Sequence, residues 1–180
     1  MCLKAELCEG KGSGQGLGTI RSAVIHEVEQ GIEAIHLLDD ITFRKLGNRT
    51  GSVGDQFRHN LDFMNAFLNG IRIGRIDYSR RERDERVAKS RHYAIEQFES
   101  VISRLKNLQR PDLGAMISVA SEIDSTVWTM SSVIREMEFV HSHTVHHHAL
   151  IAAKLAGLGV SMKEQFGVSQ STLAYWRRAA

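Results

Sequence analysis

The histidines of this chain are concentrated in one short segment. Five of the nine lie in HSHTVHHHAL, residues 141–150. Imidazole nitrogens are common ligands of transition metals, so the cluster points to a metal site. Because successive residues of an α-helix turn by about 100°, residues four apart share a face and direct neighbours do not. The five histidines therefore cannot all act together.

The apolar residues around the cluster select two of these histidines. On a helical wheel His143 and His147 fall on the apolar side, so we expect both to point inward. His146 falls at the edge of that side, and His141 and His148 are expected to be exposed or at its boundary. The apolar side is formed by Val133, Met137, Val140, Ile151, Leu155 and Leu158.

Two inward imidazoles at i and i+4 can converge on one ion, at about 2.0–2.1 Å for zinc, as in HxxxH half-sites. A hydrogen-bonded core histidine is the other explanation for each of them, so a third ligand would decide between the two. His59 is the candidate, in the middle of an earlier helix, although it lies at the margin of that helix's apolar side. Position 144 is Thr, where an HExxH metalloprotease carries its general base, which argues against peptide hydrolysis by that route.

The elements that must position these residues are mostly helical. Apolar residues recur at helical steps over 19–39, 52–70, 87–110 and 132–158, with Ser52 and Ser131 or Ser132 as N-caps, while the segment 114–130 favours a short β-hairpin. Four amphipathic helices of similar length and a single proline, Pro111, predict an all-α, up-down four-helix bundle with a small hairpin between helices three and four. The Gly-rich segment 1–18 is expected to be a flexible leader, and 19–180 one domain.

Composition excludes several classes of protein. The chain has 180 residues and a formal charge of +2, so no strong field favours nucleic acid or an anionic membrane as partner. No apolar run has the length of a membrane span or the pattern of a signal peptide, so we expect a cytoplasmic protein. Cys2 and Cys8 lack CxxC spacing and are interpreted as reduced thiols without a role.

Two stretches carry a resemblance to a known family. SVGDQFRHNLDFMNAFL, with its mid-helix histidine, and SSVIREMEFVHSHTVHHHALIA resemble the DinB superfamily (DinB/YfiT-like) of metal-binding four-helix bundles, and IDYSRRERD resembles the connection in one branch of it. The resemblance covers about residues 19–175. It implies a three-histidine site made of His59, His143 and His147. Members of the superfamily include thiol transferases, thiol-dependent isomerases and suspected metal-dependent hydrolases.

A site of this kind predicts Lewis-acid chemistry on a small molecule. We expect a divalent ion, zinc or nickel, to activate water or the thiol of a low-molecular-weight cofactor. Glu136 lies too far along the helix to be a ligand and is expected to form an ion pair with an arginine or to orient a neighbouring group. Tyr78, Arg81, Arg83 and Asp84 are candidates for gripping an anionic substrate, with a solvated charge run as the alternative. A homodimer is compatible with this fold, since such bundles often dimerise.

Two other functions compete with a metalloenzyme. The tail KEQFGVSQSTLAYWRR resembles a helix-turn-helix, which would make the protein a DNA-binding protein, although no wider basic patch supports it. If the tail instead covers the bundle, Phe166 and Trp176 are its expected anchors. The second alternative is a metal-binding or interaction module that catalyses nothing, because such a module would keep the same three histidines.

Overall fold

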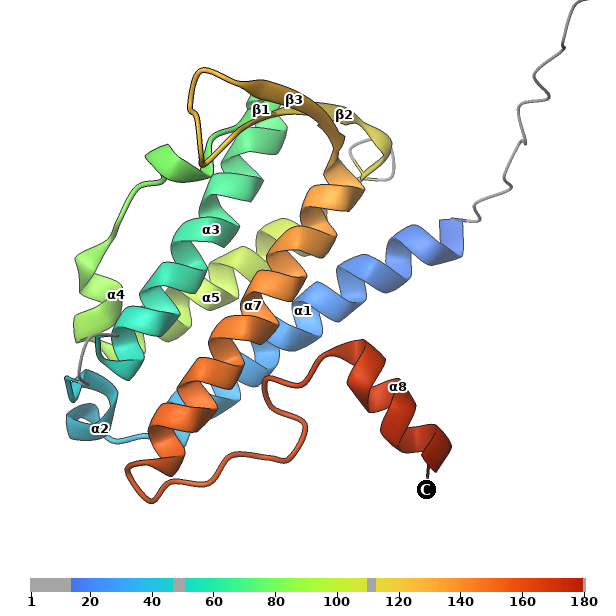
Figure 1. The fold of residues 1–180 in the computed structure, drawn as a ribbon. Coiled ribbons are helices and arrows are strands. Elements are labelled where there is room, and N and C mark those ends of the chain that lie inside the picture. The colour runs from blue at the N-terminus through green and yellow to red at the C-terminus, as the bar shows by residue number, and fades with distance from the viewer. Residues whose placement is uncertain (1–13, 47–50, 110–112, 180) are drawn as a thin grey trace, which may run out of the picture.

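The computed structural model describes residues 14–46, 51–109 and 113–179. Four long helices form its body: α1 (Gly14–His36), α3 (Val53–Ile73), α5 (Arg91–Asn107) and α7 (Val133–Ala156). The predicted helical bundle is therefore confirmed (Figure 1). Helix α1 begins five residues before its expected start at Thr19, and the other residues of the predicted leader, 1–13, lie outside the described residues, as does Pro111.

The helices that carry the histidines begin at strong N-caps. Ser52 accepts a hydrogen bond from the backbone of Asp55, whose carboxylate accepts one from the backbone of Ser52, so the two form a capping box. Ser132 caps α7 in the same way by accepting from the backbone N–H of Arg135. These caps fix where each helix begins, and therefore which residues of the helix face the core.

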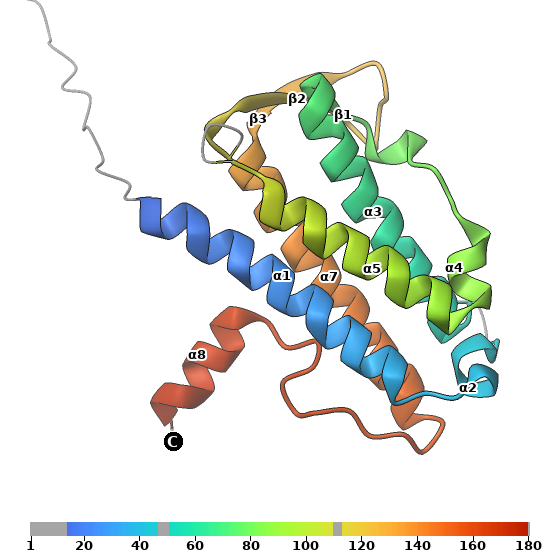
Figure 2. The same ribbon diagram turned by 180° about the vertical axis from the view of Figure 1, so that it is seen from behind.

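The predicted up-down connectivity is wrong. Helices α1 and α3 each pack against both α5 and α7, so α1 and α3 lie diagonally across the core. Helices α3 and α5 run in the same direction (Figures 1 and 2). A Cβ on Gly54, near the start of α3, would come within 2.4 Å of the Ala88 carbonyl oxygen just before α5, and Arg104 near the end of α5 donates to Asn69 near the end of α3.

The physical reason is the connection between α3 and α5. Gly74 ends α3 in the left-handed region at φ 73°, which a glycine adopts without steric cost. The chain then returns along the length of the bundle through β1 (Arg75–Ile76), the 3-10 helix η1 (Tyr78–Arg80) and α4 (Glu85–Lys89) before α5 begins. We call residues 75–90 the crossover segment. The dense charge of this segment predicts that it is solvated. It does not indicate that the segment runs along the whole bundle.

A small sheet closes the end of the bundle where α3 ends and α7 begins (Figure 1). Strands β2 (Met116–Ala120) and β3 (Trp128–Ser132) pair antiparallel, with Met116 opposite Ser132 and Ala120 opposite Trp128. This confirms the predicted hairpin, shifted by two residues. The sequence analysis missed β1, which pairs parallel to β2, because two residues are too few to show an alternating pattern.

Two further helices lie outside the four-helix body. Helix α2 (Asp40–Arg44) follows α1, and α8 (Gln170–Ala179) lies near the end of the chain. Residues 161–169, before α8, contain turns and no helix, so the first helix of a helix-turn-helix is not formed.

Helix α5 starts at Arg91 and not at the predicted Val87, because Ser90 is extended and separates it from α4. None of the helices in the described ranges is long and apolar enough to span a membrane.

The tail before α8 packs on α7. Phe166 is 5% exposed and its ring stacks on that of His148, with the ring centroids 4.5 Å apart, which confirms it as an anchor. Gly167, at φ 75°, lies against the backbone of α7, and a Cβ on it would come within 2.3 Å of the Ala149 backbone nitrogen. The expectation for Trp176 is wrong: it is 40% exposed, because α8 buries none of its residues.

Candidate metal centre

His59, His143 and His147 come together where α3 packs against α7. Each offers a ring nitrogen that lies within 4.8 Å of those offered by the other two. The ring centroid of His59 is 5.2 Å from that of His143 and 4.6 Å from that of His147, and the two rings on α7 are 4.5 Å apart. The structure thus brings together the three residues that the sequence and the family resemblance predicted as ligands.

Contacts beside the histidines set the register of the two helices. The hydroxyl of Thr144 lies 3.0 Å from Oδ1 of Asn60 and 2.7 Å from the carbonyl oxygen of Val140, in the buried interface. This contact fixes how far the antiparallel helices α3 and α7 are shifted along each other. In this register His59 lies beside His143, with the ring centroids 5.2 Å apart.

One ligand is held by a residue that the sequence analysis did not propose. Nδ1 of His147 lies 2.8 Å from Oε1 of Gln56, which comes one turn before His59 on α3. An amide oxygen only accepts, so Nδ1 carries the proton and Nε2 keeps its lone pair for a metal. The i, i+3 spacing of Gln56 and His59 was the available signal, because it puts both on one helix face.

His143 lies against an aromatic wall. Its ring stacks on Phe63 with the centroids 3.9 Å apart, and Phe63 also contacts the ring of His59 at 4.9 Å. The Nδ1 atom of His143 is buried without a hydrogen-bond partner among the residues described. A buried nitrogen without a partner is costly unless a ligand satisfies it, so this atom fits a site built for one.

Burial keeps all three imidazoles neutral. It lowers the pKa of His59 to about 4, of His143 to about 3 and of His147 to about 4, and for His59 the nearby positive charge of Arg81 and Arg58 acts in the same direction. Neutral imidazole is the form that binds a metal. His59 and His143 are only half-buried, so solvent reaches both side chains.

The other histidines of the segment lie apart. His141 is at the boundary, as expected, whereas His146, which was expected at the edge of the apolar side, is exposed. The expectation for His148 is wrong: it is fully buried, and its Nδ1 lies 3.3 Å from Oε2 of buried Glu27 on α1. The reason is that α7 packs against α1 as well as α3, so it is buried on two sides, whereas the wheel identified only one apolar side.

Glu136 and Tyr78 form a buried pair near the sheet. The Tyr78 hydroxyl donates to Oε2 of Glu136 over 3.0 Å, and Ser131 donates to Oε1 over 2.7 Å. Burial raises the pKa of Tyr78 far above its usual value, so it remains a donor. The expected ion pair of Glu136 with an arginine is wrong, because these two hydroxyl groups satisfy its carboxylate. The Tyr78 ring packs on Phe63 and Phe139, and so supports the wall behind His143.

The predicted arginines lie on the crossover segment. The guanidinium of Arg81 sits over the ring of Phe63, with Cζ 4.5 Å from the centroid, and Nη1 donates to the carbonyl oxygen of Tyr78 over 2.7 Å. Arg83 is exposed and close enough for its charge to lower the pKa of His59. The carboxylate of Asp84 accepts from Arg86 and Tyr93, so it is not free to bind a substrate.

The donor set fits a transition metal. Three neutral imidazoles with a fixed tautomer on His147 and an unpartnered nitrogen on His143 suit ions such as zinc, nickel, iron or copper, whereas calcium and magnesium prefer oxygen ligands. Among the described residues no carboxylate joins the three rings. A metal held by three protein ligands keeps a position for water or substrate, as catalytic sites require.

Comparison with known proteins supports the fold. No protein-family model and no curated protein matches the sequence. Among solved structures, the DinB-like protein YjoA from Bacillus subtilis is 17% identical with a TM-score of 0.60, over 80% of this chain and 94% of YjoA. YfiT from Bacillus subtilis, described as a probable metal-dependent hydrolase with an unusual four-helix bundle topology, is 12% identical with a TM-score of 0.62, over 89% of this chain and 95% of YfiT. The predicted resemblance is thus confirmed at the level of structure: this chain has the fold of DinB-like proteins.

Proposed function

We propose that this protein is a metal-dependent enzyme that hydrolyses a small molecule at the site formed by His59, His143 and His147. The observation that carries the proposal is the convergence of three neutral imidazoles within 4.8 Å at the interface of α3 and α7. The description of YfiT as a probable metal-dependent hydrolase supports the same reaction class.

The surrounding residues would prepare the site for this chemistry. A bound divalent ion acts as a Lewis acid and brings the pKa of a coordinated water toward neutrality. Gln56 holds the Nδ1 proton of His147, and Phe63 fixes the ring of His143 by stacking. Thr144 is hydrogen-bonded inside the helix interface, so it is not available as a general base.

Zinc or nickel is the ion we propose, since both are bound well by imidazole and the order of affinities does not choose between them. A low-molecular-weight thiol in place of water would make the same site a thiol S-transferase. In either form the partner is a small molecule in the cytoplasm, and neither DNA nor a membrane takes part. A non-catalytic metal-binding module is the alternative.

Elemental analysis by mass spectrometry tests the metal site. The protein is purified without a nickel column, and wild type is compared with the variant that combines His59→Ala, His143→Ala and His147→Ala. We expect about one equivalent of metal in wild type and none in the variant. The exposed neighbour His146→Ala is the matched control and should keep its metal. Wild type that contains no metal and takes up neither zinc nor nickel would refute the site.

A turnover assay separates an enzyme from a metal binder. Metal-loaded wild type and the His147→Ala variant are compared on a panel of carboxylic esters, amides and lactones, with and without added thiols such as cysteine or glutathione. We expect hydrolysis or thiol addition that disappears in the variant and on chelation. Stoichiometric metal without turnover on any substrate would favour the binding module.

A further inference from the structure

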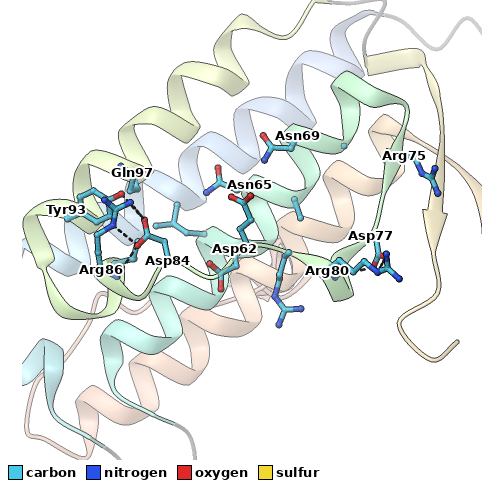
Figure 3. A pocket seen from close by; sticks show the side chains of 16 residues that line it. Asp62, Asn65, Asn69, Arg75, Asp77, Arg80, Asp84, Arg86, Tyr93 and Gln97 are labelled. Carbon is cyan, nitrogen blue, oxygen red and sulfur yellow. Dashed lines mark hydrogen bonds and ion pairs between the residues drawn. The ribbon is translucent and has the colours of Figure 1, made fainter. Parts of the chain in front are cut away.

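A cavity is lined by the crossover segment and by the two helices beside it. It has a volume of about 500 Å³ and is lined by residues of α3, α5 and the crossover segment (Figure 3). Asp62, Asn65 and Asn69 come from α3, and Tyr93 and Gln97 from α5. A volume of this size accommodates a small organic molecule. Nothing in the proposed reaction uses this cavity directly.

Most charged groups in the cavity neutralise one another. At one end Arg86 donates to both carboxylate oxygens of Asp84, over 2.9 and 2.7 Å, and Tyr93 donates to the same carboxylate over 2.8 Å, as Figure 3 shows. At the other end Arg80 lies 3.5 Å from Asp77. These groups are satisfied by each other, so they are not the ones that select a ligand.

Asp62 on the α3 wall is also neutralised. Its carboxylate lies 2.7 Å from Nη1 of Arg58, and the side chain is only 5% exposed. Glu82 lies at the exposed rim of the cavity. The acidic groups of the cavity are therefore either paired with an arginine or exposed to solvent.

Two guanidinium groups of the cavity have no carboxylate partner in the described part of the chain. Arg75 lies over the ring of Trp128, with Cζ 4.2 Å from the centroid, and Arg81 lies over the ring of Phe63 and donates to the carbonyl oxygen of Tyr78. Arg81 is half-buried and its Nε is buried without a partner. A partly desolvated guanidinium that is held in place but not neutralised is a binding group for a carboxylate or phosphate.

The amides on α3 add donors to the same cavity. Arg104 donates to Oδ1 of Asn65 over 2.9 Å and to Oδ1 of Asn69 over 2.7 Å. Because both amide oxygens are occupied by this one guanidinium, the Nδ2 groups of both residues remain to donate. The cavity thus offers amide N–H groups on one wall and Arg81 on the crossover segment.

Arg81 also connects this cavity to the metal centre. Its guanidinium is 4.5 Å from the ring of Phe63, which in turn stacks on His143. A single aromatic ring therefore separates the group that would bind an anion from a ligand of the metal. A molecule anchored at Arg81 is placed beside the three-histidine site.

We propose that this cavity binds an organic anion through Arg81, with the Asn65 and Asn69 amides as further donors, and that the substrate of the metal centre is anionic for this reason. The second part rests on the proposed function, whereas anion binding does not require a metal. The chemistry that recognises the ligand is a carboxylate or a phosphate group.

Titration of metal-free protein followed by NMR tests the proposal, with succinate and inorganic phosphate as separate probes. We expect one of the two to shift the side-chain amide signals of Asn65 and Asn69. Arg81→Gln should raise the dissociation constant at least tenfold. Arg81→Lys should raise it by less, because lysine keeps the charge without the planar fork. Arg80→Gln is the matched control: it removes the same charge from the same cavity, where it is already paired with Asp77, and should change the dissociation constant less than twofold.

The outcomes separate this proposal from the metal site. Anion binding that depends on Arg81 in a protein without metal would support the cavity and leave the metal centre to elemental analysis. Equal weakening by Arg80→Gln and Arg81→Gln would show attraction to general positive charge and overturn the proposal. So would the absence of shifts at Asn65 and Asn69 with both probes. If Arg81→Gln fails to fold, Arg81→Lys against Arg80→Lys decides between the same outcomes.

Discussion

Gln56 accepts a hydrogen bond from Nδ1 of His147, over 2.8 Å, across the interface of α3 and α7. It lies one turn before His59, so the helix that supplies one ligand also orients another. A neutral amide in this place fixes the tautomer of the imidazole without adding negative charge, whereas a carboxylate would make the ligand more basic.

The first prediction concerns Gln56. Gln56→Leu removes the acceptor for Nδ1 of His147, so the zinc affinity should fall about 10- to 100-fold, as is usual when the partner of a metal-binding histidine is lost. Gln56→Glu should bind zinc at least as tightly as wild type. Competition with a chromophoric chelator measures both. Unchanged affinity in Gln56→Leu would mean that the hydrogen bond does not orient the ligand.

The second prediction concerns pH. The folded-state pKa values of His59, His143 and His147 lie near 4, 3 and 4, below the usual value of about 6.5, so between these limits the unfolded chain binds more protons than the folded one. The metal-free protein should therefore lose stability as pH falls from about 6.5 toward 4 and show no change from these groups above pH 7.

Urea unfolding at pH 7.5 and pH 5, with a chelator present, measures this effect. Other groups also titrate in this range, so the informative comparison is with His143→Leu. This variant should lose less stability than wild type between the two pH values, because one of the three groups is gone. Equal losses in both proteins would contradict the assigned pKa shift of His143.

The third prediction concerns the tail. Gly167 and Gly159 both have a positive φ, 75° and 77°, but a Cβ on Gly167 would meet the backbone of α7 at 2.3 Å, whereas a Cβ on Gly159 would meet no atom within 4 Å. Gly159→Ala should cost about 1–2 kcal/mol in unfolding free energy from the left-handed conformation alone. Gly167→Ala should cost more, because the tail must also move away from α7. Similar losses would show that the tail is not held against α7 in solution.

The fourth prediction concerns the pair of Tyr78 and Glu136. Tyr78→Phe keeps the aromatic contacts with Phe63 and Phe139 but removes the donor to a buried carboxylate, so it should destabilise the fold by about 1–3 kcal/mol. The double variant Tyr78→Phe, Glu136→Gln should regain part of this loss, because an uncharged group is left instead of a carboxylate. Chemical denaturation measures both. A double variant less stable than Tyr78→Phe would contradict this account.

Part of this structure follows from local patterns in the sequence. The i, i+4 spacing of His143 and His147 within an apolar helix side determined that both rings point into the bundle, because the helical period acts over a few residues. The serines before α3 and α7 determined where these helices begin, and the segment 114–130 indicated the hairpin, although the strands begin and end two residues later. His59 was the candidate for the third ligand from its position in the middle of a facing helix, and the family resemblance supported it because its place on the helical wheel was marginal.

The rest depends on how the helices are arranged, which no local pattern contains. The direction of α5 depends on the crossover segment, which carries no periodicity that distinguishes a turn from a return along the bundle. His148 is buried because α1 covers a second side of α7, and Gln56 reaches His147 only because α3 and α7 are antiparallel in one register. Periodicity determines which side of a helix is apolar, but the packing of the other helices decides how much of each helix is buried and which polar residues meet there.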